Sequence, residues 1–169
     1  MPVFPKPRVV DDLRGTLLRY LDFYRGVIAD KVAGLPGDQL QESRVPSGWS
    51  PAGLVNHLVN VERRWLDWGF AGEDLGDPWR DQATRRSWVA PRLTGAGLRT
   101  LLEERGRATR ELVERHDLTE TARVGGRFSD PAEAPDLQGI LLHLVQEYAR
   151  HAGHLDIVRE LIDGELGEN

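Results

Sequence analysis

Apolar residues recur at every third or fourth position in four separate stretches of the chain, and this periodicity constrains the fold most. We predict helices near residues 10–33, 51–69, 95–115 and 136–163, and we find no convincing strand pattern and no internal repeat. The 169 residues are enough to enclose a hydrophobic core. The sequence therefore predicts an all-α protein, a four-helix bundle formed as a single domain over residues 1–169.

Helix-capping residues mark the ends of these stretches. Ser50, which precedes a proline, is typical of an N-cap, and Asp136 is expected to cap the last helix. Gly164 is expected to end that helix. Glycine and proline predict a long irregular connection over residues 69–91, between the second and third helices, and a second irregular stretch over 117–135.

The third helix is expected to bury its apolar residues and to expose its charges. The inward set consists of Leu98, Leu101, Leu102, Ala108 and Leu112. Glutamate and arginine fill most of the remaining positions, and we interpret them as a solvated face.

Charge and composition exclude several classes of function. The chain has 22 basic and 27 acidic residues, a net charge of −5, and no basic cluster, which argues against a nucleic-acid partner. No stretch approaches the roughly 18 uninterrupted apolar residues of a membrane helix, and the proline-rich N-terminus lacks an apolar signal region, so we expect a cytoplasmic protein. Cysteine is absent, so any thiol chemistry must use the sulfur of another molecule.

Three residues with metal-ligating side chains are expected to meet inside the bundle. His151 falls on the apolar stripe of the last helix, and Glu147 lies one turn before it on the same face. His57 lies beside the apolar stripe of the second helix. Two histidines and a carboxylate form a zinc-type ligand set with one open position, and imidazole also suits nickel and iron. The alternative is a hydrogen-bonded core histidine and an ordinary ion pair between Glu147 and His151.

The other histidines are assigned lesser roles. His154 lies near this set and is expected to orient a ligand or to transfer a proton. His143 is interpreted as a boundary residue, and His116 as a cation at the C-terminal end of the third helix.

Five tryptophans cluster in the middle of the sequence: Trp49, Trp65, Trp68, Trp79 and Trp88. Most are expected to anchor the core or the loops. The functional alternative is that Trp68, Trp79 and Trp88 form the wall of a ligand pocket above the metal.

Two segments, GWSPAGLVNHLVNVERRW at 48–65 and HLVQEYARHAGHLDIVREL at 143–161, resemble the DinB-like superfamily of four-helix metalloproteins. They are most similar to the branch that contains mycothiol-dependent maleylpyruvate isomerase and thiol S-transferases. The resemblance implies a divalent metal, zinc or nickel, at His57, Glu147 and His151. Many members have histidine where Glu147 stands, whereas the mycothiol-dependent branch has glutamate. The family's closing glutamine is replaced by His154, so any role of that glutamine would pass to this histidine or be lost.

This resemblance leads to one main functional hypothesis and two alternatives. The main hypothesis is a metal-dependent S-transferase that activates a low-molecular-weight thiol such as mycothiol and adds it to a small electrophile. The alternatives are a hydrolase that uses a metal-bound hydroxide, and a catalytically silent small-molecule binding or stress-response protein. Exposed apolar positions of the first helix would also allow a homodimer.

Overall fold

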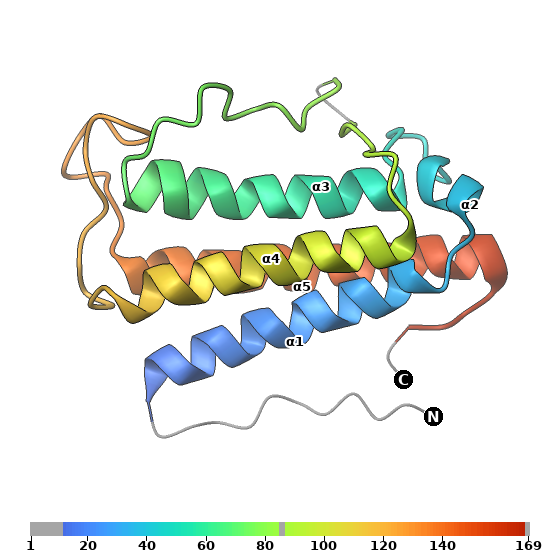
Figure 1. Cartoon of the computed structure of the whole chain (residues 1–169), viewed down its shortest axis with the longest axis horizontal. Coiled ribbons are helices and arrows are strands. Elements are labelled where there is room, and N and C mark those ends of the chain that lie inside the picture. Colours follow the sequence, from blue (N-terminus) through green and yellow to red (C-terminus); the bar gives the residue numbers. More distant parts are fainter. Residues whose placement is uncertain (1–11, 85–86, 168–169) are drawn as a thin grey trace.

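The computed structural model describes residues 12–84 and 87–167, and helices dominate this part of the chain (Figure 1). The long helices are α1 (Leu13–Ala33), α3 (Pro51–Glu62), α4 (Gly95–Glu114) and α5 (Leu137–Asp163). Helix α3 continues as a π-helix, η1 (Arg63–Phe70), and a short helix, α2 (Gly37–Gln41), follows α1. The all-α prediction is confirmed, while residues 10 and 11 of the predicted first helix lie outside the described residues.

A polar side chain caps the start of each long helix. Asp12, Ser50, Thr94 and Asp136 each accept a hydrogen bond from the backbone N–H three residues later. At the far end of α5, Gly164 adopts a φ of 75°, the left-handed conformation that glycine tolerates best. The predicted caps Ser50, Asp136 and Gly164 are therefore confirmed.

The direction of the helices explains the long irregular connection. In Figure 1, α3 and α4 both run from right to left, whereas α1 and α5 run from left to right. The connection between η1 and α4 must therefore return along the whole bundle, and Figure 1 shows its described parts, residues 71–84 and 87–94, above α3. This return segment, which we call the crossover, contains few regular elements, and it lies over the helix that carries His57.

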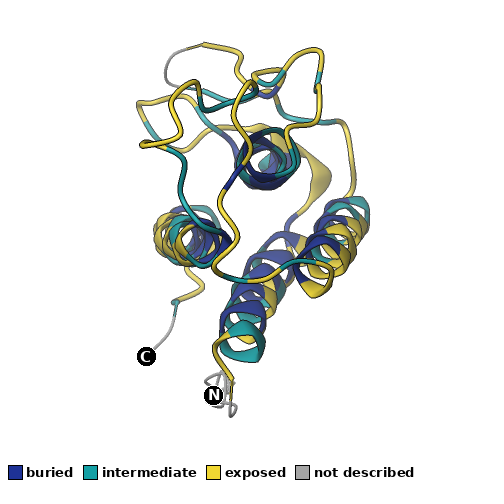
Figure 2. Ribbon diagram, turned by 90° about the vertical axis from the view of Figure 1, so that its left-hand side faces the viewer, coloured by how far each residue is buried: buried dark blue, intermediate teal, exposed yellow. Residues whose placement is uncertain are grey.

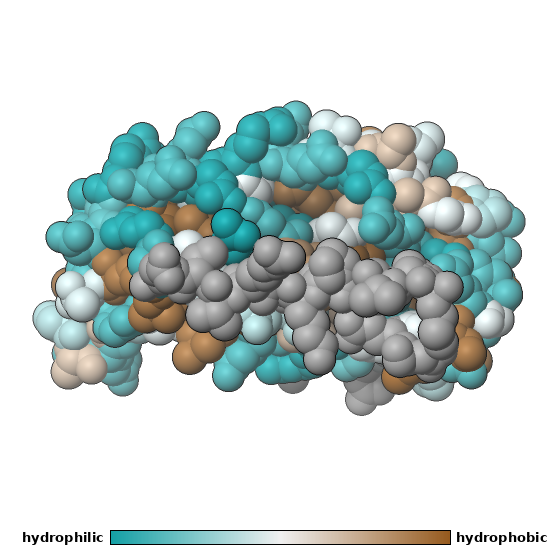
Figure 3. Space-filling view, turned by 90° about the horizontal axis from the view of Figure 1, so that it is seen from below, coloured by the Kyte–Doolittle hydropathy of each residue, from teal (hydrophilic) through white to brown (hydrophobic). Residues whose placement is uncertain are grey.

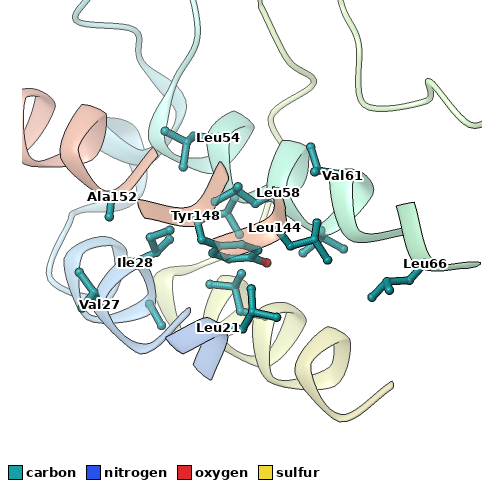
Figure 4. Packing of buried hydrophobic residues seen from close by; sticks show 14 of the residues in the cluster. Leu21, Val27, Ile28, Leu54, Leu58, Val61, Leu66, Leu144, Tyr148 and Ala152 are labelled. Atoms are coloured by element: carbon teal, nitrogen blue, oxygen red, sulfur yellow. The ribbon is translucent and has the colours of Figure 1, made fainter. Parts of the chain in front are cut away.

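The core lies where α1 and α3 each pack against both α4 and α5. The end view in Figure 2 shows buried residues on the facing sides of the helices. Figure 4 shows the ring of Tyr148 among Leu21, Leu58 and Leu144, which come from three different helices. Burial of these apolar side chains supplies most of the folding free energy.

The core also encloses a carboxylate, which the sequence interpretation missed. Glu62 has no exposed surface and accepts hydrogen bonds from Arg25, Thr109 and the hydroxyl of Tyr148. Arg105 Nε lies 3.8 Å from Glu62 Oε2. The interpretation of the charges on the third helix as a solvated face is therefore wrong for Arg105, which turns inward to this carboxylate.

Two further expectations about burial are wrong. Ala108 was expected to face inward but is exposed, because the buried positions of α4 follow Leu98, Leu102, Arg105 and Thr109 instead. In the second helix, the apolar spacing predicts one stripe that runs from Leu54, Leu58 and Val61 to Trp65 and Trp68. The wider π-helical turn instead places Leu66 and Phe70 on the buried face. Both tryptophans are consequently only half-buried.

Exposed apolar residues bear on the predicted homodimer. Among the exposed large hydrophobic residues of the described chain, α1 supplies Leu13, whereas α5 supplies Leu142, Ile157 and Leu161. Figure 3 shows several separate hydrophobic groups among hydrophilic ones on the lower face. The homodimer therefore stays a prediction. None of the described helices has the length and hydrophobicity needed to cross a bilayer.

Candidate metal centre

The three predicted metal ligands lie together between α3 and α5. His57, Glu147 and His151 each offer a ligand atom, and these atoms all lie within 4.8 Å of one another. On α5, Nε2 of His151 lies 3.5 Å from Oε2 of Glu147. We call these residues the triad.

A buried aspartate on the crossover fixes the orientation of His57. Asp81 Oδ2 lies 3.0 Å from Nδ1 of His57, and the same carboxylate accepts hydrogen bonds from Arg64. Burial alone would raise the pKa of Asp81, but the hydrogen bonds from His57 and Arg64 lower it, so the carboxylate is ionised. An ionised carboxylate only accepts, so His57 donates through Nδ1 and Nε2 keeps its lone pair.

Trp88, also on the crossover, covers the triad. Its ring stacks on His57 with 4.0 Å between centroids and 14° between planes, and it meets His151 edge-on at 5.4 Å. The Asn56 side chain donates to the carbonyl of Val89, which ties this part of the crossover to α3. A Cβ at Gly53 would lie 3.0 Å from the Trp88 carbonyl oxygen, so glycine allows this close approach.

His154 contacts the other side of His151. The two Nδ1 atoms are 3.2 Å apart, and the ring of Trp49 lies 6.4 Å from that of His154. One of these nitrogens must donate to the other. His151 can carry its proton on Nε2 and donate it to Glu147, or carry it on Nδ1 and donate it to His154, which leaves the Nε2 lone pair facing the carboxylate. Burial and the neighbouring His151 lower the pKa of His154, and burial lowers that of His57, so both rings are neutral at pH 7.

Glu147 is ionised, and among the described residues it forms an ion pair with Arg150. A hydrogen bond from His151 lowers its pKa to about 2, against burial, and Arg150 contributes from 3.3 Å. His143 Nε2 lies 4.0 Å from its Oε1.

When His151 donates through Nδ1 to His154, the lone pairs of two imidazoles and one carboxylate converge on one space. The 3.5 Å between the two α5 ligand atoms matches the roughly 3.4 Å expected between ligands of a tetrahedral zinc ion. The residues present therefore fit a divalent ion.

The remaining predicted residues lie at different distances from the triad. Trp88 lies against it, whereas Trp68 packs near Arg127 and Trp79 lies under Arg64 and is 46% exposed. A pocket bounded by all three tryptophans therefore stays a prediction. His116 follows α4, with its Nδ1 2.9 Å from a carboxylate oxygen of Glu120.

Sequence reasoning missed Asp81 and Arg64, which orient His57. Asp81 lies in a segment without periodicity, so no pattern marks it as inward. Arg64 is buried because the π-helix begins at residue 63, and no local sequence signal predicts that register change.

The comparison with protein families agrees with the geometry. The chain matches the mycothiol-S-transferase family over residues 16–164. This match spans all the described helices except the first residues of α1. A search among curated proteins gives no match. On the strength of the match over most of its length, the chain belongs to the mycothiol-S-transferase family.

Proposed function

We propose that the protein is a metal-dependent S-transferase that joins mycothiol to a small electrophilic molecule. In this proposal His57, Glu147 and His151 hold a divalent ion, with zinc as the first choice and nickel or iron as alternatives. Membership of the mycothiol-S-transferase family supports the thiol and the reaction class. The absence of cysteine is consistent with sulfur supplied by a cosubstrate.

The observation that carries the proposal is that ligand atoms of two imidazoles and one carboxylate lie within 4.8 Å of one another. Asp81 holds the His57 proton on Nδ1, and His154 can accept the His151 proton at the same ring position. Both Nε2 atoms are then free for a cation. A bound divalent ion lowers the pKa of a thiol, so the thiolate is available at neutral pH.

The protein's own residues have three tasks in this reaction. Asp81 and Arg64 orient His57, and Trp88 excludes water from the side of the crossover. His154 is neutral at pH 7 and carries its proton on Nε2 while Nδ1 accepts from His151, so it takes the thiol proton at Nδ1 when that hydrogen bond opens. The sulfur then forms a bond to the electrophilic carbon, and the leaving group departs with its electron pair where the electrophile carries one.

Turnover with mycothiol and an activated aryl chloride tests this function. Product formation should require the divalent ion and should disappear in His57→Ala. The matched control is His116→Ala, which removes an imidazole outside the triad and should keep full activity. Cobalt-substituted protein should gain a sulfur-to-cobalt absorption band when mycothiol is added. An unchanged spectrum together with metal-dependent ester hydrolysis would replace this proposal with a hydrolase.

Removal of the His154 imidazole separates proton transfer from metal binding. His154→Ala should keep most of the metal, or lose only about 10–100-fold in affinity, because the ring contacts a ligand rather than the ion. Turnover should fall about 10²–10⁴-fold if the ring is the base. Complete loss of metal would make His154 a ligand, and unchanged turnover would remove it from the mechanism.

A further inference from the structure

Arg127 differs from the buried arginines of the bundle in its partners. Arg25, Arg64, Arg105 and Arg159 each pair with a carboxylate within the protein. Arg127 is half-buried, yet within residues 12–84 and 87–167 its recorded contacts are with aromatic rings and not with a carboxylate. A partly buried guanidinium that does not pair with a carboxylate of the protein can bind an anion.

The position of Arg127 is set by close packing of a turn against η1. The backbone N–H of Gly125 donates to Phe128 O at 2.9 Å, which closes the turn. A Cβ at Gly126 would lie 2.8 Å from the Trp68 carbonyl oxygen, so only glycine permits this approach. The guanidinium carbon consequently lies 4.2 Å from the Trp65 ring centroid and 5.8 Å from that of Trp68. These rings hold the cation by their π faces and do not neutralise it.

The Trp65 ring connects Arg127 to the triad. Its centroid lies 4.4 Å from that of His143, and Nε2 of His143 lies 4.0 Å from Oε1 of Glu147. Arg127 therefore lies on the Glu147 side of the triad, with Trp65 and His143 between them.

The local charge favours an anion at this place. Burial and the nearby positive charge of Arg64 lower the pKa of Arg127, which means that its charged form is destabilised where it stands. An incoming carboxylate would relieve that cost. A guanidinium can bind both oxygens of a carboxylate with two parallel N–H donors, whereas a neutral substituent offers no such pairing.

We propose that Arg127 binds a carboxylate of the electrophile, so that the substrates of this protein are carboxylate-bearing electrophiles. This inference rests on the proposed function, and it adds the substrate class and a residue that selects it. The electrophile would lie along Trp65, with its carboxylate at Arg127 and its reactive carbon toward the triad.

Two electrophiles that differ in one substituent, a carboxylate or its neutral amide, test the selection. One is 4-chloro-3-nitrobenzoate, and the other is its neutral amide, 4-chloro-3-nitrobenzamide. With either compound the thiolate sulfur bonds to the ring carbon and chloride leaves with the electron pair. With metal-loaded protein and mycothiol, KM for the benzoate should be about 10–100-fold lower than KM for the amide.

Substitutions at Arg127 assign this preference to one side chain. Arg127→Gln should raise KM for the benzoate about 10–100-fold, leave KM for the amide nearly unchanged and keep the metal content. Arg127→Lys keeps the charge over the rings and should retain part of the preference. Arg123→Gln removes an exposed charge from the neighbouring part of the same segment and is the matched control. Equal KM values for the two compounds in the parent, or an undiminished preference in Arg127→Gln, would overturn the inference.

A binding measurement separates this inference from the proposed function. Calorimetry with 4-nitrobenzoate, which lacks the leaving group, needs neither thiol nor turnover. Binding that weakens about 10–100-fold in Arg127→Gln supports the carboxylate site even if no thiol reacts, in which case the transferase proposal alone fails. Unchanged binding in that variant overturns the site. In the transferase assay, 4-nitrobenzoate should compete with the electrophile, and competition with mycothiol instead would contradict the assignment.

Discussion

Glu62 and Glu147 are two carboxylates inside one helical bundle, yet their surroundings differ. Glu62 has no exposed surface, and Arg25, Tyr148 and Thr109 all donate to it. Glu147 is half-buried and faces His143 and His151, and among the described residues Arg150 is the arginine that pairs with it.

The difference shows how a structural carboxylate is distinguished from a candidate ligand. A carboxylate whose lone pairs are taken by fixed donors has little capacity for a metal ion. A carboxylate that shares its space with imidazole rings keeps that capacity. A ranking of candidate metal ligands by burial and charge alone would have placed Glu62 first. The hydrogen-bond partners of a carboxylate are therefore the better guide to its function.

Removal of charge from Glu62 should produce the largest effect on stability. Glu62→Gln keeps the shape of the side chain but leaves Arg25 and Arg105 without their shared carboxylate. Breaking a buried ion pair in this way costs about 3–5 kcal/mol, so the free energy of unfolding should fall by that amount. Urea unfolding of the metal-free protein measures it.

Glu111→Gln, at an exposed position of α4, is the matched control and should change stability by less than about 0.5 kcal/mol. A loss below about 1 kcal/mol in Glu62→Gln would mean that the buried cluster does not hold the core together, and the comparison between the two carboxylates would fail.

Removal of charge from Asp81 should weaken metal binding. The amide in Asp81→Asn cannot hold the proton on Nδ1 of His57 as an ionised carboxylate does. The tautomer of His57 with a free Nε2 is therefore less favoured. The affinity for zinc should fall about 10–100-fold in a competition titration with a chelator. Glu73→Gln, which removes an exposed charge from the same crossover, should bind zinc like the parent. Equal affinities in Asp81→Asn and the parent would show that His57 needs no such support.

Acidification of the metal-free protein should reveal the favourable contacts of Glu147. Its pKa in the folded state is about 2, below the model-peptide value of 4.5, chiefly because of the hydrogen bond from His151. The resulting stability is present above pH 4.5 and is lost as the pH falls toward 2. Glu147→Gln lacks this contribution, so its deficit of about 1–2 kcal/mol at pH 6 should shrink on acidification. A deficit that is constant from pH 6 to pH 3 would contradict this, and Glu160→Gln serves as the exposed control on the same helix.

The helices and much of the triad could be predicted from the sequence because both depend on local spacing. Glu147 and His151 are one helical turn apart, and His57 lies beside an apolar stripe that had to face the core. The capping residues likewise act on their own helix.

The orientation of His57 and the burial pattern of η1 depend on contacts between segments that are distant in the sequence. Asp81 reaches His57 only because α3 and α4 run in the same direction and the crossover must return along the bundle. The π-helix changes which residues of η1 are buried, so Trp65 is only half-buried at the edge of the core and supports Arg127. Spacing alone carries no information on either feature.

The metal content of the purified protein tests the central claim most directly. Elemental analysis of the parent, after loading with zinc and removal of excess, should give about one divalent ion per chain. The variants His57→Ala, Glu147→Ala and His151→Ala should each lose most of it, and His116→Ala should retain it. Circular dichroism should show that the helices persist in all four, since apolar burial rather than the ion holds the bundle. A parent without stoichiometric metal, or triad variants that hold as much metal as the parent, would contradict the account.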